Sequence, residues 1–217
     1  MTTTTATPRE IDTKLAAIWT EIAAAERRFG FIANDLLHLA GATYYYRGRK
    51  RVTDMTLAQA VERVTEAAAY IEAYQAANVT TEGGYTGTNW DGYNAAQAHG
   101  VQTYDTKKPA EYLAKLADQR AILADLAAKE RAVADLYAGW SRFFLVTSSA
   151  GHVHRSMACS TCRPTTTYGW LPELSGKDEA AAVAELGPNL CTVCFPSAPV
   201  AWTGGKLTAA QAAKRSA

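Results

Sequence analysis

The feature that most constrains this chain is its pair of C-x-x-C motifs, which together use all four cysteines of the 217 residues. Each motif delivers two thiolates from one tight turn, and two such turns typically make a tetrahedral zinc site. The sequence therefore predicts one structural zinc ion, bound by Cys159, Cys162, Cys191 and Cys194.

Three other uses of four cysteines fit this sequence less well than zinc. Two disulfides need an oxidising compartment, and the N-terminus, Met1-Thr2-Thr3-Thr4-Thr5, has neither the basic flank nor the apolar core of a secretory signal. A redox C-x-x-C usually occurs once, beside a βαβ pattern that this sequence does not show. Thiolates favour zinc or an iron–sulfur cluster over magnesium or calcium, so an iron–sulfur cluster is the remaining metal alternative.

Two histidines precede the first cysteine pair, in Gly151-His152-Val153-His154. Side chains alternate along a strand, so in a strand both imidazoles point to the same face. One of them then either replaces Cys162 as the fourth ligand or lies beside a thiolate. An ordinary half-exposed histidine is the alternative for each.

The overall charge excludes a strong general attraction to nucleic acid or membranes, since 22 basic residues face 21 acidic ones. No apolar run approaches the roughly 18–20 residues of a membrane span. We therefore expect a soluble, cytoplasmic protein.

One segment departs from this balance. Residues 27–51 hold six basic residues and one acidic residue, Asp35, and the run Tyr44-Tyr45-Tyr46 precedes the densest cluster. Aromatic rings beside basic side chains are typical of surfaces that stack bases and hold phosphates. The alternative is a solvated basic edge whose tyrosines pack on the core. The candidate nucleic-acid-binding residues are Arg47, Arg49, Lys50 and Arg51.

Helix signals dominate the N-terminal part. Thr7, Pro8 and Glu10 form a capping box that opens a helix, and Gly30 is a plausible stop with a second short helix from Phe31 to Leu39. A second capping box, at Thr56 and Gln59, opens a helix over 57–77. The longest helix is expected over 109–138, with apolar residues in an a/d-like, coiled-coil pattern. Its partner is expected to be the 57–77 helix, in an antiparallel hairpin, or a second copy of the chain, in a homodimer.

The pattern changes at Gly139. Strands are expected at 143–146, on the return segment with the two histidines, and at 168–171. A short helix over 178–186, capped by Ser175 or Lys177-Asp178 and closed by Gly187-Pro188, leads to the second cysteine pair.

The expected fold class is mainly α with a small α+β zinc-binding module: an N-terminal helical hairpin or bundle followed by a zinc-ribbon-like domain. The expected divisions are a disordered tail at 1–8, a helical domain at 9–138 with a Gly/aromatic loop at 79–105, a zinc-binding domain at 139–202 and a flexible tail at 203–217.

The layout of 143–196 resembles the metal-binding module of Ada-like DNA-repair proteins: a strand, a first ligand pair, an Ala-rich helix that ends in glycine, and then C-x-x-C-x-Pro. Here the last part reads Gly187-Pro188-Asn189-Leu190-Cys191-Thr192-Val193-Cys194-Phe195-Pro196. Related small modules use a histidine as their first ligand. In this sequence, His154 followed by Cys159 resembles that first ligand pair. The segment also resembles one in uncharacterised proteins of phages that infect actinobacteria.

The Ada-like resemblance implies an alkyl-transfer activity in which a zinc-bound cysteine, Cys159 by position, accepts a methyl group from a DNA phosphotriester. The residues themselves favour a structural zinc site, because four thiolates usually fill the coordination sphere of the ion and leave no open position. The charged side chains of 139–202 also sum to zero before the thiolates are counted, which suits DNA poorly.

The sequence thus predicts a non-enzymatic, zinc-stabilised binding or adaptor protein, phage-encoded and acting in the host cytoplasm, whose partner is a host protein or nucleic acid. The alternatives are a metal-dependent enzyme that modifies nucleic acid, either a nuclease or an alkyl transferase, and a self-assembling structural phage component.

Overall fold

The computed structural model describes residues 6–47, 50–77, 79–80, 84–85, 94, 96–103, 105–147 and 151–199. Four predictions from the sequence concern residues that lie wholly or largely outside these ranges: the threonine tail, Arg49, most of the 79–105 loop, and the 203–217 tail.

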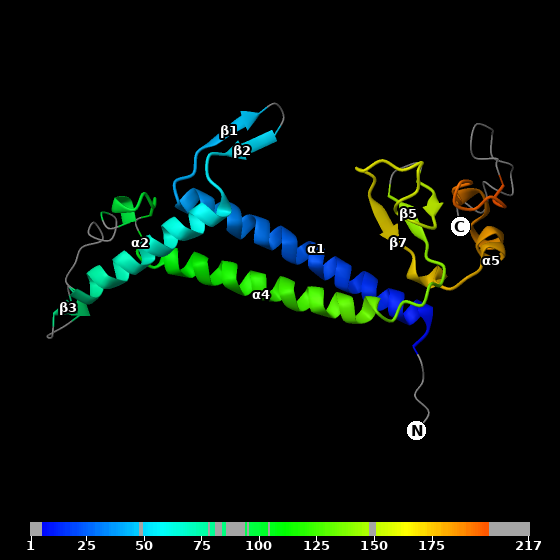
Figure 1. The fold of residues 1–217 in the computed structure, drawn as a ribbon, viewed down its shortest axis with the longest axis horizontal. Helices are drawn as coiled ribbons and strands as arrows, with labels where there is room; N and C mark the ends of the chain where they lie inside the picture. Colours follow the sequence, from blue (N-terminus) through cyan, green and yellow to red (C-terminus); the bar gives the residue numbers. More distant parts are fainter. Residues whose placement is uncertain are drawn as a thin grey trace, which may run out of the picture. The chain divides into compact units, whose positions relative to one another are not determined.

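The described part of the chain is mainly helical, with small sheets (Figure 1). The α-helices are α1 (Pro8–Leu39), α2 (Leu57–Ala77), α4 (Lys108–Ala134) and α5 (Glu179–Leu186). Two antiparallel hairpins pair β1 (Tyr44–Arg47) with β2 (Lys50–Thr53) and β3 (Val79–Thr80) with β4 (Gly84–Tyr85). A three-stranded antiparallel sheet has the order β6 (Val153–His154), β5 (Phe144–Val146), β7 (Tyr168–Trp170). Two 3-10 turns, Pro172–Leu174 and Gly187–Asn189, flank α5 in the chain.

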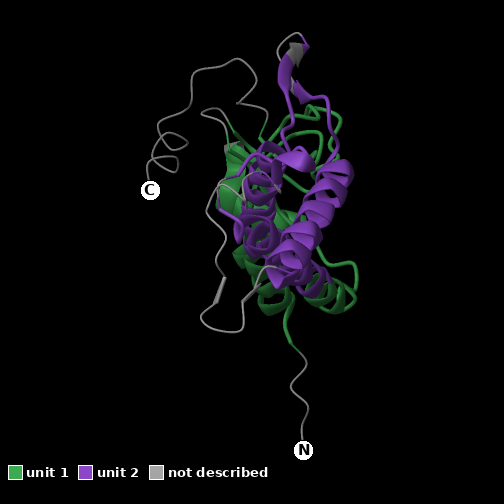
Figure 2. Ribbon diagram, turned by 90° about the vertical axis from the view of Figure 1, so that its left-hand side faces the viewer, with its two compact units in different colours: residues 1–20, 128–217 green, residues 21–127 purple. Residues whose placement is uncertain are grey.

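The chain forms two compact units (Figure 2). The divisions between them do not coincide with the predicted boundary between residues 138 and 139. Unit 1 comprises residues 1–20 and 128–217, and unit 2 comprises residues 21–127. The start of α1 and the end of α4 therefore belong with the cysteine-containing module.

The start of α1 confirms the first capping box. The backbone N–H of Thr7 donates to Glu10 Oε2 (2.8 Å), and the N–H of Glu10 donates to Thr7 Oγ1 (3.3 Å). These reciprocal bonds satisfy donors that a helix start leaves without partners.

The predicted stop at Gly30 is wrong, since α1 continues unbroken to Leu39. Leu36 and Leu39 are buried in the core of unit 2, and their burial outweighs the roughly 1 kcal/mol that a helical glycine costs. The helix ends at Gly41 instead, whose N–H donates to His38 O while that of Ala42 donates to Leu37 O. Gly41 has φ +75°, as this helix-ending motif requires.

The second capping box is also confirmed, because the N–H groups of Thr56 and Gln59 bond to each other's side chains (2.9 and 3.3 Å). The resulting helix α2 has the predicted bounds. Its buried residues Ala60, Val64, Ala67 and Ile71 join residues of α1 and Leu116 of α4 in the core of unit 2.

Helix α4 has a second neighbour besides the predicted α2. In unit 2, Gln119 donates to the Ala25 carbonyl of α1 (3.2 Å); in unit 1, Trp19 of α1 donates to Glu130 (2.7 Å). Helices α1 and α4 are therefore antiparallel neighbours, while α2 packs near the N-terminal part of α4. The sequence did not show this, because α1 looked like two shorter helices.

Unit 1 has its own small core, formed by buried side chains of the sheet, of α5 and of the segments around them. Two of them, Phe143 and Phe195, stack with ring centroids 5.6 Å apart. The others are Val153, Leu174, Ala182, Leu190 and Ala198. The predicted short helix is confirmed as α5, with Asp178 as N-cap accepting from the N–H of Ala181 (2.7 Å).

A buried charge ties the start of α1 to this module. Asp12 has no exposed surface, and its carboxylate accepts bonds from Arg142 Nη2 (2.7 Å) and Trp140 Nε1 (2.8 Å). The Arg142 guanidinium also lies over the rings of Tyr137 (3.8 Å) and Trp170 (4.9 Å). This network links the start of α1 to residues 140–142, which lie in the same unit.

Candidate metal centre

The two-residue strand β6 brings the candidate ligands together. His154 is wholly buried and pairs with Phe144 of β5. On the other side of β6, the N–H of Cys191 donates to the Val153 carbonyl (2.9 Å), next to a parallel bridge between Val153 and Leu190. The backbone of β6 thus holds the second cysteine pair beside the histidine.

The turns at the cysteine pairs are also held by their backbones. The N–H of Cys162 donates to the Cys159 carbonyl (3.0 Å), and the N–H of Phe195 donates to the Cys191 carbonyl (2.9 Å). Such turns keep the two cysteines of each pair close together, as in many metal sites.

Four side chains lie close enough together to hold a metal ion: His154, Cys159, Cys191 and Cys194. One ligand atom from each lies within 4.8 Å of all the others, and His154 Nδ1 lies 3.6 Å from Cys194 Sγ. The structure therefore groups three of the four predicted cysteines with the histidine that the sequence offered as an alternative ligand.

Cys162 is not in this group of four, but it borders it. Its Sγ lies 3.5 Å from His154 Nε2 and 3.7 Å from His154 Nδ1. The site thus offers five donors, one more than a tetrahedral ion takes. His152 lies beside it too, with its ring centroid 4.8 Å from that of His154, on the same side as the strand alternation predicts.

Two polar side chains that the sequence did not single out also contact the cysteines. The Thr161 hydroxyl lies 3.2 Å from Cys159 Sγ and 3.7 Å from Cys191 Sγ. Tyr168 donates to the Met157 carbonyl (2.9 Å), and its ring lies edge-on to His154. No sequence signal identifies Tyr168, because only the pairing of β7 with β5 brings it here.

The electrostatics fit a set of donors that bind a cation. Burial, and then the nearby His152, lowers the pKa of His154, which favours the neutral imidazole that a metal ligand must be. Burial raises the pKa of Cys194 to about 11, and the neighbouring Cys159 adds to this effect. Burial also opposes ionisation of Cys159, but hydrogen bonds led by that from Thr161 outweigh it and lower its pKa.

Negative charges would also lie close together around Cys162. The hydrogen bond to Cys162, followed by burial and by the charges of Cys162 and Cys159, raises the pKa of Tyr168 to about 12. A bound cation would relieve this repulsion between thiolates.

The predicted nucleic-acid-binding residues lie in another part of the chain, on the β1–β2 hairpin of unit 2. Arg47 ends β1 and is exposed, while Lys50 and Arg51 begin β2. Arg49 lies outside the described residues. Arg47, Lys50 and Arg51 therefore share one hairpin, which the sequence did not predict.

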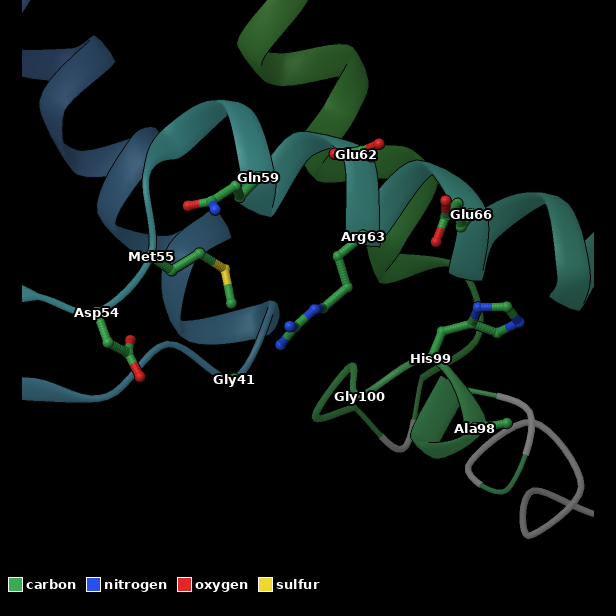
Figure 3. A pocket seen from close by; sticks show the side chains of 10 residues that line it. All are labelled: Gly41, Asp54, Met55, Gln59, Glu62, Arg63, Glu66, Ala98, His99 and Gly100. Carbon is green, nitrogen blue, oxygen red and sulfur yellow. The ribbon is translucent and has the colours of Figure 1, made fainter.

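Unit 2 also has a pocket of about 680 Å³ near the base of this hairpin (Figure 3). Arg63 reaches across it toward Gly41 and donates to the Ala40 carbonyl (2.9 Å). Its acidic lining residues, Asp54, Glu62 and Glu66, outnumber this arginine, so the pocket suits a phosphate poorly.

Comparison of the chain with models of known protein families, with curated proteins and with solved structures returned no match. Fold and site together define the class of protein: a mainly helical chain with a candidate His/Cys metal centre in a small α+β module. Within the described residues, every helix is too short or too polar to cross a membrane.

Proposed function

We propose that this chain is a non-enzymatic binding or adaptor protein whose C-terminal module is stabilised by one structural Zn²⁺. The observation that carries the proposal is the group of four protein donors within 4.8 Å of one another. Four protein ligands close a tetrahedral coordination sphere, whereas catalytic zinc sites usually keep three and leave a position for water.

The donor chemistry favours zinc. Three thiolates and one imidazole are soft to borderline ligands, which suit zinc better than magnesium or calcium. The module also needs such a centre, because its core consists of a few side chains around two stacked phenylalanines. In small domains of this kind, metal-binding energy becomes folding energy.

Metal content of purified variants tests the ligand set. We expect one zinc per chain in the wild type, loss of zinc in Cys191→Ser and His154→Ala, and retention in Cys162→Ser. Zinc lost with Cys162 and retained without His154 would instead establish the four-thiolate site that the sequence predicts. A wild-type protein without bound metal, purified without chelator, would refute the structural centre.

Cobalt substitution tests whether the coordination sphere is closed. Co²⁺ in place of zinc should show the visible absorption of a tetrahedral site, and added azide should leave that spectrum unchanged. Azide-dependent bands would reveal an open position and overturn the non-enzymatic proposal.

One observation favours a second candidate, a metal-dependent enzyme that transfers an alkyl group from nucleic acid. The fifth donor, Cys162, lies 3.5 Å from His154 Nε2, so one thiol remains unligated beside the metal if the other four donors bind it. Incubation with methylated DNA followed by mass spectrometry tests this candidate: a mass increase of one methyl group on a single cysteine would support it, and an unmodified protein would count against it.

A further inference from the structure

We propose that the β1–β2 hairpin is a duplex-DNA-binding ribbon that enters the major groove. This inference rests on the proposed role as a binding protein and names its partner class. It concerns unit 2, whereas the metal centre lies in unit 1.

The charge of the hairpin is the first argument. Residues 44–53 carry four basic side chains and no acidic one, in a chain whose net charge is only +1. In the strand register, Arg47 lies directly opposite Lys50. Like charges in direct cross-strand pairs destabilise a hairpin, and the phosphates of a nucleic acid would turn this repulsion into attraction.

The second argument is the face on which Arg47 lies. The Tyr44 hydroxyl bonds to Asn34 Oδ1 (3.2 Å), and its ring packs on His38 (4.6 Å), so the Tyr44 face turns toward α1. Alternation along the strand places Tyr45 and Arg47 on the opposite face. Tyr45 is 53% exposed and Arg47 is also exposed, so this face is open to a partner.

The base of the hairpin is firmly held, so the ribbon is presented in a defined position. The backbone N–H of Thr43 donates to Asp54 Oδ1 (2.9 Å), its hydroxyl bonds to Asp54 Oδ2, and the N–H of Asp54 donates to the Thr43 carbonyl (3.2 Å). These bonds close the two strands just before β1 and just after β2. A two-stranded hairpin without such support is marginal in water.

The dimensions fit the major groove of B-DNA. Four-residue strands extend about 13 Å at about 3.3 Å per residue, and two paired strands lie about 4.8 Å apart. The groove is about 12 Å wide and about 8.5 Å deep, and it admits a two-stranded ribbon. The deep, narrow major groove of an RNA duplex does not admit side chains in this way.

A neighbouring part of α1 supplies a further contact. Arg27 and Phe31 lie at helical spacing from Asn34, on the face of α1 that carries Tyr44, and Phe31 is 72% exposed. Arg27 is exposed as well, so it is available to a phosphate beside the groove.

Fluorescence anisotropy with a short, labelled duplex of random sequence tests the proposal on the full-length, metal-loaded chain. We expect Arg47→Ala/Lys50→Ala to weaken binding about tenfold or more near 100 mM salt and to reduce the slope of log K against log salt by about 2. The matched control is Lys107→Ala/Lys108→Ala, which removes two exposed lysines of the same unit and should change the affinity less than about threefold.

Four outcomes would overturn the proposal. The first two are that the wild type does not bind the duplex, or that both double variants lose the same affinity for it. The other two are that the chain binds single-stranded DNA more tightly than the duplex and loses this binding in Tyr45→Ala, or that it binds phosphatidylserine vesicles in place of DNA. Metal content, measured on the same samples, separates this result from the proposed function. If the chain contains zinc but does not bind DNA, only the proposal of a DNA-binding hairpin is refuted. If the chain binds DNA but contains no metal, only the proposal of a structural zinc site is refuted.

Discussion

Asp12 is the charged residue whose role depends most on the tertiary structure. In the sequence it is one acidic residue in the first turns of an amphipathic helix, where a solvated position is the rule. In the structure it is wholly buried and accepts bonds from Arg142 and Trp140, which follow it by well over a hundred residues. Local periodicity carries no information about such a distant partner.

We expect Asp12→Ala to lower the free energy of unfolding of unit 1 by about 3–5 kcal/mol, because it leaves the Arg142 guanidinium, whose side chain is only 18% exposed, without its counter-charge. Chemical denaturation followed by tryptophan fluorescence measures this loss, since Trp19 and Trp140 both lie in unit 1.

The matched control is Glu185→Ala, which breaks the exposed ion pair with Lys177 in the same unit. It should cost less than about 1 kcal/mol. Equal losses in the two variants would contradict the importance of burial for the Asp12 network.

Gln119 and Glu130 are two further polar residues whose partners lie far away in the sequence. Both look like polar interruptions of the apolar pattern in the long helix. Each has a partner on α1, the Ala25 carbonyl and the Trp19 indole respectively. Polar residues on an otherwise apolar stripe thus specify the register of α4 against α1, a role that becomes visible only when the neighbouring helix is known.

At the scale of single elements, most of the structure follows from local signals. The two capping boxes, the bounds of α2, the position of α5 and the strands β5 and β7 agree with the predictions. The end of α1 was missed, although Gly41 carries the usual glycine signal, because the earlier Gly30 offered the same signal. Which glycine ends the helix depends on the burial of the residues between them.

The two glycines give a paired prediction. Gly30→Ala should raise the free energy of unfolding of unit 2 by about 0.5–1 kcal/mol, because the glycine is inside a helix and an added Cβ meets no atom within 4 Å. Urea denaturation followed by circular dichroism measures the change.

Gly41→Ala should lower the same free energy by more than about 1 kcal/mol, since Gly41 has φ +75° and its Cβ would lie 2.9 Å from the Gly100 carbonyl oxygen. A destabilising Gly30→Ala together with a neutral Gly41→Ala would show that α1 ends at Gly30 after all.

At the scale of the whole molecule, the two units predict two responses to loss of the metal. We expect Cys191→Ser, or treatment of the wild type with a strong chelator, to melt unit 1 while unit 2 keeps its helices. Unit 2 contains α2 and most of α1 and α4, so far-ultraviolet circular dichroism should retain most of its helical signal.

Near-ultraviolet circular dichroism should lose most of its signal in the same experiment, because Trp19, Trp140 and Trp170 all lie in unit 1. Cys162→Ser is the matched control, and it should preserve both signals if His154 is a ligand. Simultaneous loss of all helix in Cys191→Ser would contradict the division into two units.

The sequence alone determined the helices with strong capping boxes, the mainly helical class, and the gathering of cysteines at one site, because caps, periodicity and C-x-x-C turns act over a few residues. The tertiary structure decided what depends on distant contacts. It paired α1 with α4, placed residues 1–20 with the cysteine module through Asp12, and gathered His154 with three cysteines by the backbone of β6. The physical reason is that these contacts join residues far apart in the chain, and burial, rather than local preference, selects among them.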